Sequence, residues 1–222
     1  NVILSGMLDA LVIHPALRGI TLQNEQDNVL IVEAMAGEVW HDFVRHCLQQ
    51  GWYGLENLSY IPGTVGAAPV QNIGAYGVEI TDVFESLTAL DIHTGETRDF
   101  SHDECRFAYR DSIFKQEEMD RYLITRVRFR LSRQPVRRLD YGDIRNELAV
   151  QGISQPSPLQ LSDVIIAIRQ RKLPDPAVVG NAGSFFKNPV ISEHDFHVLK
   201  EKFPDVVAYP QKVGVKLAAG WL

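Results

Sequence analysis

One arginine, Arg110, stands between a tyrosine and an aspartate in the stretch FAYRDSIFK, residues 107–115. A guanidinium held in place can stabilise negative charge that develops on a reacting group. More often such an arginine only forms an ion pair, here with the adjacent Asp111 or with Glu104. The residues alone favour the ion pair.

A serine that follows a glycine, Ser184, lies in the stretch GNAGSFFKNP, residues 180–189. Its hydroxyl could act as a nucleophile or as a proton donor. The G-x-S-x-G elbow of many serine hydrolases is missing, because residue 186 is phenylalanine. The simpler interpretation, which composition favours, is a turn serine that hydrogen-bonds its own backbone.

The stretch IPGTVGAAPVQNIGAYGVEI, residues 61–80, is rich in glycine and alanine. Glycine permits a positive φ and lets another group touch the backbone, and exposed amides could hold the pyrophosphate of a flat cofactor. The stretch lacks the G-x-G-x-x-G fingerprint of dinucleotide-binding folds. Composition alone therefore favours a tight, well-packed turn over a ligand site.

The first half of the chain predicts a strand in residues 28–37 and a helix in 38–50, with Gly51 at its C-terminal cap. Residues 83–100 predict two strands joined by a turn. The SHDE spacing of residues 101–104 resembles a capping box and predicts a short helix there.

The second half predicts a strand in residues 122–131, whose Leu123, Thr125, Val127, Phe129 and Leu131 face one way while Arg126, Arg128 and Arg130 face the solvent. We expect Ser162 to cap one helix and Ser192 to begin the last one. Residues 172–189 are dense in proline and glycine and mark either a linker or a functional loop, and a break near residues 173–176 divides a larger part from a smaller C-terminal one. Hairpins mixed with helices indicate an α+β fold.

Composition narrows the function classes. The net charge of −6 argues against nucleic-acid binding, and no apolar run approaches the roughly 20 residues of a membrane helix. The seven histidines are not spaced for a metal, and two cysteines make no disulfide framework. A phosphate ligand is conceivable beside Lys172, Lys187 and Lys216, which lie near glycines and prolines.

Five stretches occur in an order that strongly resembles the UDP-N-acetylenolpyruvoylglucosamine reductase (MurB) family, in its larger enterobacterial and pseudomonad type. They are GLENLSYIPGTVGAAPVQNIGAYGVE (54–79), CRFAYRDSIFK (105–115), RKLPDP (171–176), GNAGSFFKNP (180–189) and VKLAAGWL (215–222). The stretch LDYGDI (139–144) is also typical of the larger type.

The resemblance implies an FAD-binding domain of the vanillyl-alcohol-oxidase (PCMH) type and the start of a smaller α+β substrate-binding domain. The expected boundaries are 1–18 for a remnant of the first FAD subdomain, 19–173 for the FAD domain and 174–222 for part of the UDP-sugar domain. The implied enzyme is a cytoplasmic monomer of peptidoglycan synthesis. It uses NADPH and FAD to reduce UDP-N-acetylenolpyruvoylglucosamine to UDP-N-acetylmuramate, and it binds neither nucleic acid nor membrane.

The resemblance also implies roles for single residues. Arg110 matches the catalytic arginine and Ser184 the proton donor. The implied UDP-sugar contacts are Tyr141, Lys172, Asn188, Tyr209, Gln211 and Lys216. The implied FAD contacts are Asn1, Gly63, Thr64, Gly66, Ala67, Gln71, Ile73, Gly74 and Arg169.

Some features depart from the family. The start, NVIL, looks like the end of the family's Gly-rich phosphate loop, and the chain ends before the family's catalytic glutamate. We therefore expect an incomplete enzyme that binds FAD poorly. Ala67 replaces a serine of some members, and residues 209–216 look one residue short. Two alternatives stay open: another FAD-dependent oxidoreductase of this fold, or a non-catalytic fragment that binds sugar nucleotides.

Overall fold

The computed structural model describes residues 6–7, 9, 11–174, 178–179, 186–211 and 213–218 of the chain. The chain divides into a large unit, Leu8–Pro174, and a small unit, Asp175–Leu222 together with Asn1–Met7.

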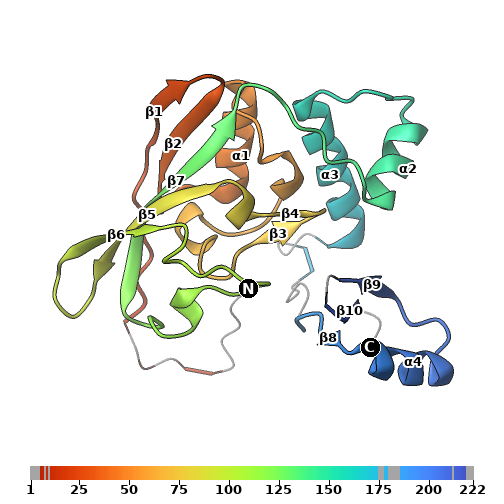
Figure 1. Cartoon of the computed structure of the whole chain (residues 1–222). Helices are drawn as coiled ribbons and strands as arrows, with labels where there is room; N and C mark the ends of the chain where they lie inside the picture. The colour runs from red at the N-terminus through yellow and green to blue at the C-terminus, as the bar shows by residue number, and fades with distance from the viewer. Residues whose placement is uncertain are drawn as a thin grey trace. The chain divides into compact units, whose positions relative to one another are not determined.

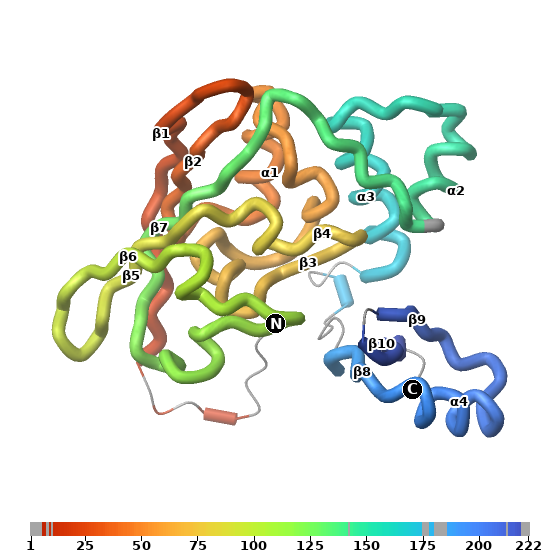
Figure 2. Tube along the Cα trace, viewed as in Figure 1, coloured from red at the N-terminus to blue at the C-terminus, as the bar shows by residue number. Residues whose placement is uncertain are grey.

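The large unit is built on a five-stranded antiparallel sheet with the order β1-β2-β7-β5-β6. Its strands are β1 (Ile20–Gln26), β2 (Val29–Met35), β5 (Phe84–Asp91), β6 (Thr97–Ser101) and β7 (Tyr122–Ser132). The late strand β7 lies between β2 and β5, as the green tube between red and yellow shows (Figure 2). The strands expected at 28–37 and in 83–100 are confirmed.

One face of the sheet carries the main hydrophobic core and is covered by α1 (Trp40–Gln49) (Figure 1). The rings of Trp40 and Phe43 pack on Phe129 of β7, with centroids 5.9 and 4.9 Å away. The helix stops as expected at Gly51, whose φ of 72° is one that glycine adopts without strain.

Arginines line the opposite face of β7, as predicted. Arg128 pairs with Glu33 at 2.9 Å and Arg130 with Glu85 at 2.8 Å, so the face is polar but neutralised. The predicted alternation is confirmed for Val127, Phe129 and Leu131, which are buried. It is wrong at the start of the strand, where Ile124 is buried while Leu123 and Thr125 are half-buried, because the β5–β7 pairing shifts its register between Thr88 and Ala89.

A short hairpin leaves the small-residue loop: β3 (Gly74–Ala75) pairs with β4 (Val78–Glu79). Tyr76 and Gly77 connect the strands with φ values of 49° and 78°. Two successive positive φ values define a two-residue type I′ turn, the tightest common hairpin connection. Single 3-10 turns occupy η1 (Glu56–Leu58), η2 (Val65–Ala67), η3 (Ile80–Asp82) and η4 (Ile113–Lys115).

A second hydrophobic core joins α2 (Gly142–Val150) to α3 (Pro158–Lys172). Its buried residues are Ile144, Leu148, Leu161, Val164, Ile165 and Ile168. The cap of α3 is Ser157, whose Oγ accepts from the Gln160 N–H at 3.2 Å. The prediction of Ser162 as the cap is wrong: Ser162 lies inside the helix, and its buried hydroxyl contacts Ser59 Oγ at 2.8 Å.

The prediction of a short helix at residues 101–104 is also wrong. The Glu104 carboxylate accepts from the Ser101 N–H at 2.9 Å and Ser101 Oγ accepts from the Glu104 N–H at 3.4 Å, so the bonds of a capping box do form. Ser101, however, ends strand β6, and Arg106 has a left-handed φ of 45°. The chain therefore makes a turn there and no helix.

The small unit holds a three-stranded antiparallel sheet in the order β8-β10-β9 and one helix. The elements are β8 (Val190–Ile191), α4 (Glu193–Lys202), β9 (Ala208–Pro210) and β10 (Val215–Leu217). The expected helix start is confirmed, because Ser192 Oγ accepts from the Asp195 N–H at 3.0 Å. Over the described part of both units, no helix is long and apolar enough to cross a membrane.

Candidate functional site

Arg110 lies at the tip of a tight turn. Ala108 and Asp111 close the turn with two reciprocal N–H···O bonds of 3.1 Å, and Arg110 has a φ of 55°. A left-handed backbone costs a residue with a side chain about 1–2 kcal/mol. Surrounding contacts must therefore hold this conformation.

The guanidinium of Arg110 reaches the base of the β3–β4 hairpin. Nη2 donates to the Gly74 carbonyl at 2.6 Å, and Nη1 donates to the Asn72 carbonyl at 3.3 Å. The prediction that Arg110 pairs with Asp111 or Glu104 is wrong. The carboxylate that faces Arg110 belongs to Glu79, with 3.5 Å between Nη1 and Oε1. About a third of the Arg110 side chain, 32%, stays exposed, so a ligand could contact it.

The small-residue loop is fastened to the end of β2. The carbonyl of Gly63 accepts from the Trp40 N–H at 3.0 Å, and the Gly66 N–H donates to the Ala36 carbonyl at 2.9 Å. A Cβ on Gly66 would lie 2.6 Å from the Ala36 Cβ, so close packing requires this glycine. The composition-based preference for a packed turn is correct at Gly66.

Other residues of the loop leave room for a ligand. Gly63, Ala67 and Gln71 are exposed, and Thr64 and Gly74 are half-buried. No atom lies within 4 Å of a Cβ built on Gly63. Small exposed residues on a fixed backbone suit the close approach of a flat ring or a pyrophosphate, so these residues fit a flavin nucleotide. Ile73 is 7% exposed, which leaves mainly its backbone for a ligand.

The tip of the β3–β4 hairpin, at Tyr76 and Gly77, lies near a second group of polar residues: Tyr141, Arg169 and Lys172. The Tyr76 and Tyr141 rings lie edge to face with centroids 5.8 Å apart, and the Arg169 guanidinium lies within electrostatic range of the Tyr76 phenol. Burial raises the pKa of the Tyr76 phenol and lowers the pKa of the Arg169 guanidinium. Arg169 also donates from Nε to the Tyr60 carbonyl at 3.0 Å.

Lys172 stands near this tip at the end of α3. Its ammonium forms an ion pair with Asp143 of α2, and both side chains are about half exposed, 58% and 48%. The Tyr141 ring packs over Gly77, 3.1 Å from the position of a Cβ there. Arg110 therefore contacts the base of the hairpin and Tyr141 contacts its tip, where Arg169 and Lys172 also lie near Tyr76.

The remaining predicted residues divide between the small unit and the part of the chain outside the described residues. Ser184 and Asn1 lie outside the described residues. In the small unit, Tyr209 of β9 and Lys216 of β10 are direct cross-strand partners, so their side chains share a face of the sheet. The Gln211 N–H donates to the Gly214 carbonyl at 3.0 Å, and Asn188 precedes β8.

Among the residues that contact the predicted ones, Asn72, Tyr76 and Glu79 were not singled out from the sequence. The dipeptide Tyr76–Gly77 was the available signal, because a glycine in a two-residue connection is typical of a tight hairpin. Asn72 carries no such signal, since its role depends on contacts far along the chain, with Ala108 and Arg110.

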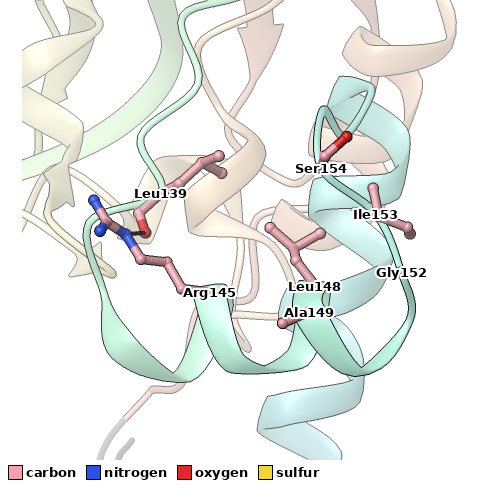
Figure 3. A pocket seen from close by; sticks show the side chains of 7 residues that line it. All are labelled: Leu139, Arg145, Leu148, Ala149, Gly152, Ile153 and Ser154. Atoms are coloured by element: carbon pink, nitrogen blue, oxygen red, sulfur yellow. Dashed lines mark hydrogen bonds between the residues drawn. The ribbon is translucent and has the colours of Figure 1, made fainter.

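A separate apolar hollow of about 350 Å³ lies beside α2 (Figure 3). It is lined by Leu139, Arg145, Leu148, Ala149, Gly152, Ile153 and Ser154. None of the predicted site residues lines this hollow.

Comparison with known proteins first gives a class. A family model described as an FAD binding domain matches residues 1–101, which include the small-residue loop. The sheet, the loop and this match together define a chain with an FAD-binding domain.

The particular family follows from curated relatives. The chain is 59% identical over 223 residues to UDP-N-acetylenolpyruvoylglucosamine reductase of Pseudomonas fluorescens, covering all of this chain and 66% of that protein. It is 56% identical over 224 residues to the reductase of Chromobacterium violaceum, with the same coverage. The chain belongs to the UDP-N-acetylenolpyruvoylglucosamine reductase family, and it spans just under two thirds of the length of these relatives.

A solved structure supports the fold. The crystal structure of UDP-N-acetylenolpyruvylglucosamine reductase from Thermus caldophilus aligns with a TM-score of 0.51 and 24% identity. The alignment covers 82% of this chain and 59% of that one. The expected α+β fold with an FAD-binding domain is confirmed.

Proposed function

We propose that the protein is an FAD-dependent reductase that uses NADPH to convert UDP-N-acetylenolpyruvoylglucosamine to UDP-N-acetylmuramate in peptidoglycan synthesis. The observation that carries the proposal is the Arg110 guanidinium, held on the Gly74 carbonyl at the edge of the small-residue loop. A fixed cation beside a surface that fits a flavin is what this reaction needs.

The loop residues Gly63, Thr64, Gly66, Ala67, Gln71, Ile73 and Gly74 would hold the FAD, with Arg169 nearby and Asn1 at the phosphates. A bound flavin supplies hydride chemistry, taking a hydride from NADPH and passing one to the substrate. The protein's own part is to bind both partners and to stabilise the charge that the hydride brings.

Arg110 would supply that stabilisation. The enolpyruvyl group is a vinyl ether conjugated with a carboxylate, so hydride arriving at its terminal carbon pushes an electron pair toward the carboxylate as an enolate. A cation that is fixed before the reaction stabilises this charge without reorganising. The contacts of Arg110 with the Gly74 and Asn72 carbonyls fix it in this sense.

Ser184 would then protonate the carbon next to the carboxylate, as the family resemblance implies. A serine hydroxyl is a weak acid, so it needs close positioning and a stabilised alkoxide. The added hydride and this proton complete the reduction of the double bond.

The family resemblance assigns UDP-sugar contacts to residues of the large unit and, separately, to residues of the small unit. Lys172 presents a point charge suited to a diphosphate, and Tyr141 presents a ring. Asn188, Tyr209, Gln211 and Lys216 are the proposed contacts in the small unit, two of which pair across β9 and β10.

The test uses the full-length gene product, with its flavin first reduced by NADPH without oxygen. Addition of UDP-N-acetylenolpyruvoylglucosamine should reoxidise the flavin. Arg110→Met should slow that step by about 10²–10³-fold and leave reduction by NADPH unchanged. The matched control is Arg130→Met, because Arg130 pairs with Glu85 on the polar face of the sheet.

Other outcomes would replace the proposal. A flavin that NADPH or another donor reduces, but that this substrate does not reoxidise, would indicate a different oxidoreductase of the same fold. A protein that UDP-sugars stabilise thermally, but that binds no flavin, would indicate a sugar-nucleotide-binding protein.

A further inference from the structure

We propose that Asn72 is a positioning residue for Arg110: it pins the turn that carries the arginine and restrains the carboxylate that faces the guanidinium. The kinetic part of this proposal rests on the proposed reductase function. The geometric part rests on contacts within the large unit.

The side chain of Asn72 is fully engaged in a buried site, with 1% of the residue exposed. Its Nδ2 donates to Glu79 Oε2 at 2.8 Å and to the Ala108 carbonyl at 2.9 Å, and its Oδ1 accepts from the Thr81 N–H at 3.2 Å. Two acceptors on one side and a donor on the other define which end of the amide is nitrogen. The amide can therefore satisfy these partners in only one orientation.

The first contact acts on the backbone of Arg110. The Ala108 carbonyl lies two residues before Arg110, in the residue pair that closes the tight turn. The carbonyl of Asn72 itself accepts from Arg110 Nη1 at 3.3 Å. Asn72 thus contacts both the turn and the guanidinium at its tip.

The second contact acts on the charge of Arg110. Glu79 faces Arg110 at 3.5 Å, longer than the 2.7–2.9 Å typical of a strong charged hydrogen bond. The Glu79 carboxylate is instead held by Asn72 Nδ2 and by the Asp82 backbone N–H, within a capping box. Because Asn72 keeps this carboxylate from closing on the guanidinium, the cation stays available to a negatively charged substrate group.

The backbone of Asn72 explains the residue type and supplies a clean variant. Its φ is 43°, a left-handed value that asparagine and glycine tolerate better than other residues. Asn72→Gly keeps this backbone and the carbonyl that Arg110 uses, and it removes only the amide. Asn28→Gly is the matched control, because Asn28 has a φ of 69° in the β1–β2 turn.

The experiment measures the two half-reactions of the full-length protein separately. Asn72→Gly should slow flavin reoxidation by the enolpyruvyl substrate about tenfold or more, with unchanged FAD content and unchanged reduction by NADPH. Adding Glu79→Gln to Asn72→Gly should recover part of the rate, because the competing charge is removed. Asn28→Gly should match the wild type in every measurement.

A second variant covers the case in which Asn72→Gly does not fold. Asn72→Asp is nearly isosteric and keeps the acceptor for Thr81, but it brings a second carboxylate beside Glu79. Its reoxidation rate should be lowest at neutral pH and should recover as the pH falls and the new carboxyl regains a proton to donate.

Two results would overturn the proposal. One is a reoxidation rate in Asn72→Gly equal to that of Asn28→Gly. The other is a crystal structure of Asn72→Gly in which Arg110 still donates to the Gly74 carbonyl and Glu79 has not moved toward the guanidinium. If the wild type is not reoxidised by the enolpyruvyl substrate at all, the reductase proposal fails, and the crystal structure alone decides the role of Asn72.

Discussion

Arg110 Nη2 donates a hydrogen bond of 2.6 Å to the carbonyl of Gly74, and Nη1 lies 2.7 Å from where a Gly74 Cβ would stand. Gly74 has no left-handed φ, so a glycine is required there for space, because a Cβ would crowd the guanidinium, Glu79 Cγ and the Val78 carbonyl, the last two at 2.9 and 3.0 Å. The guanidinium occupies space that a side chain on residue 74 would need.

Replacing Gly74 with alanine should therefore displace Arg110. The new Cβ would also lie 2.9 Å from Glu79 Cγ, so a shift of the hairpin base by itself could not relieve the clash. We expect the reoxidation of flavin by the enolpyruvyl substrate to fall about 10–100-fold in stopped-flow measurements. Gly95→Ala, in the β5–β6 turn, is the control: its φ of 76° makes alanine cost some stability, but the reoxidation rate should stay at the wild-type value.

Replacing Gly66 with alanine should affect stability. Its Cβ would lie 2.6 Å from the Ala36 Cβ, and overpacking of this kind costs about 1–3 kcal/mol of unfolding free energy. Adding Ala36→Gly should restore part of the loss in a denaturant titration. If the unfolding free energy of the double variant is no higher than that of Gly66→Ala, a contact other than the one with Ala36 causes the loss.

The start of α3 gives a test of the cap that the structure assigns. Ser157→Ala should lower the unfolding free energy by about 1 kcal/mol, because the Gln160 N–H loses its acceptor. Ser157→Asp retains an acceptor and should stay close to the wild type. Equal losses in the two variants would contradict the capping role.

The buried carboxyl of Glu56 should make stability depend on pH. Burial raises its pKa above the ordinary 4.5, and Oε1 has no hydrogen-bond partner in the described structure. Folding favours the protonated form, so its stabilising contribution is complete below pH 4.5 and is lost as the pH rises through the folded-state pKa. The thermal unfolding temperature of Glu56→Gln should fall less than that of the wild type as the pH rises through this pKa. Equal falls in the two proteins would contradict the assignment.

The ion pair between Lys172 and Asp143 should compete with a bound diphosphate. Asp143→Asn would free the ammonium, and an exposed pair of this kind is worth about 0.2–1 kcal/mol. We therefore expect UDP to bind up to about fivefold more tightly in calorimetry, with a weaker effect at high salt. Unchanged affinity at low salt would argue against a role for Lys172 in binding phosphate.

Local signals predicted much of the scaffold from the sequence. Apolar spacing located α1 and most of β7, and Ser192 correctly marked the start of α4. The signals failed where a contact or a backbone conformation outside the motif decided the outcome. Ser162 resembles a cap but is buried against Ser59, and Ser101 with Glu104 makes capping bonds without a helix because Arg106 turns the chain away.

The candidate site was less accessible from the sequence. The family motifs pointed to Arg110 and Gly74, yet nothing in the spacing indicates that they touch, since they lie 36 residues apart. Asn72 is equally distant from Ala108, and its importance lies in three hydrogen bonds that only the folded chain creates. Long-range pairing of this kind leaves no local pattern.

The type I′ turn at Tyr76 and Gly77 has a consequence for how the family can change in length. A two-residue connection cannot absorb an insertion, and each strand of the hairpin has only two residues. One added residue would move the Tyr76–Tyr141 contact at the tip relative to the Arg110–Gly74 contact at the base, so the two could not form together. Insertions and deletions in this family should therefore avoid residues 74–79 and accumulate in loops such as the β5–β6 turn.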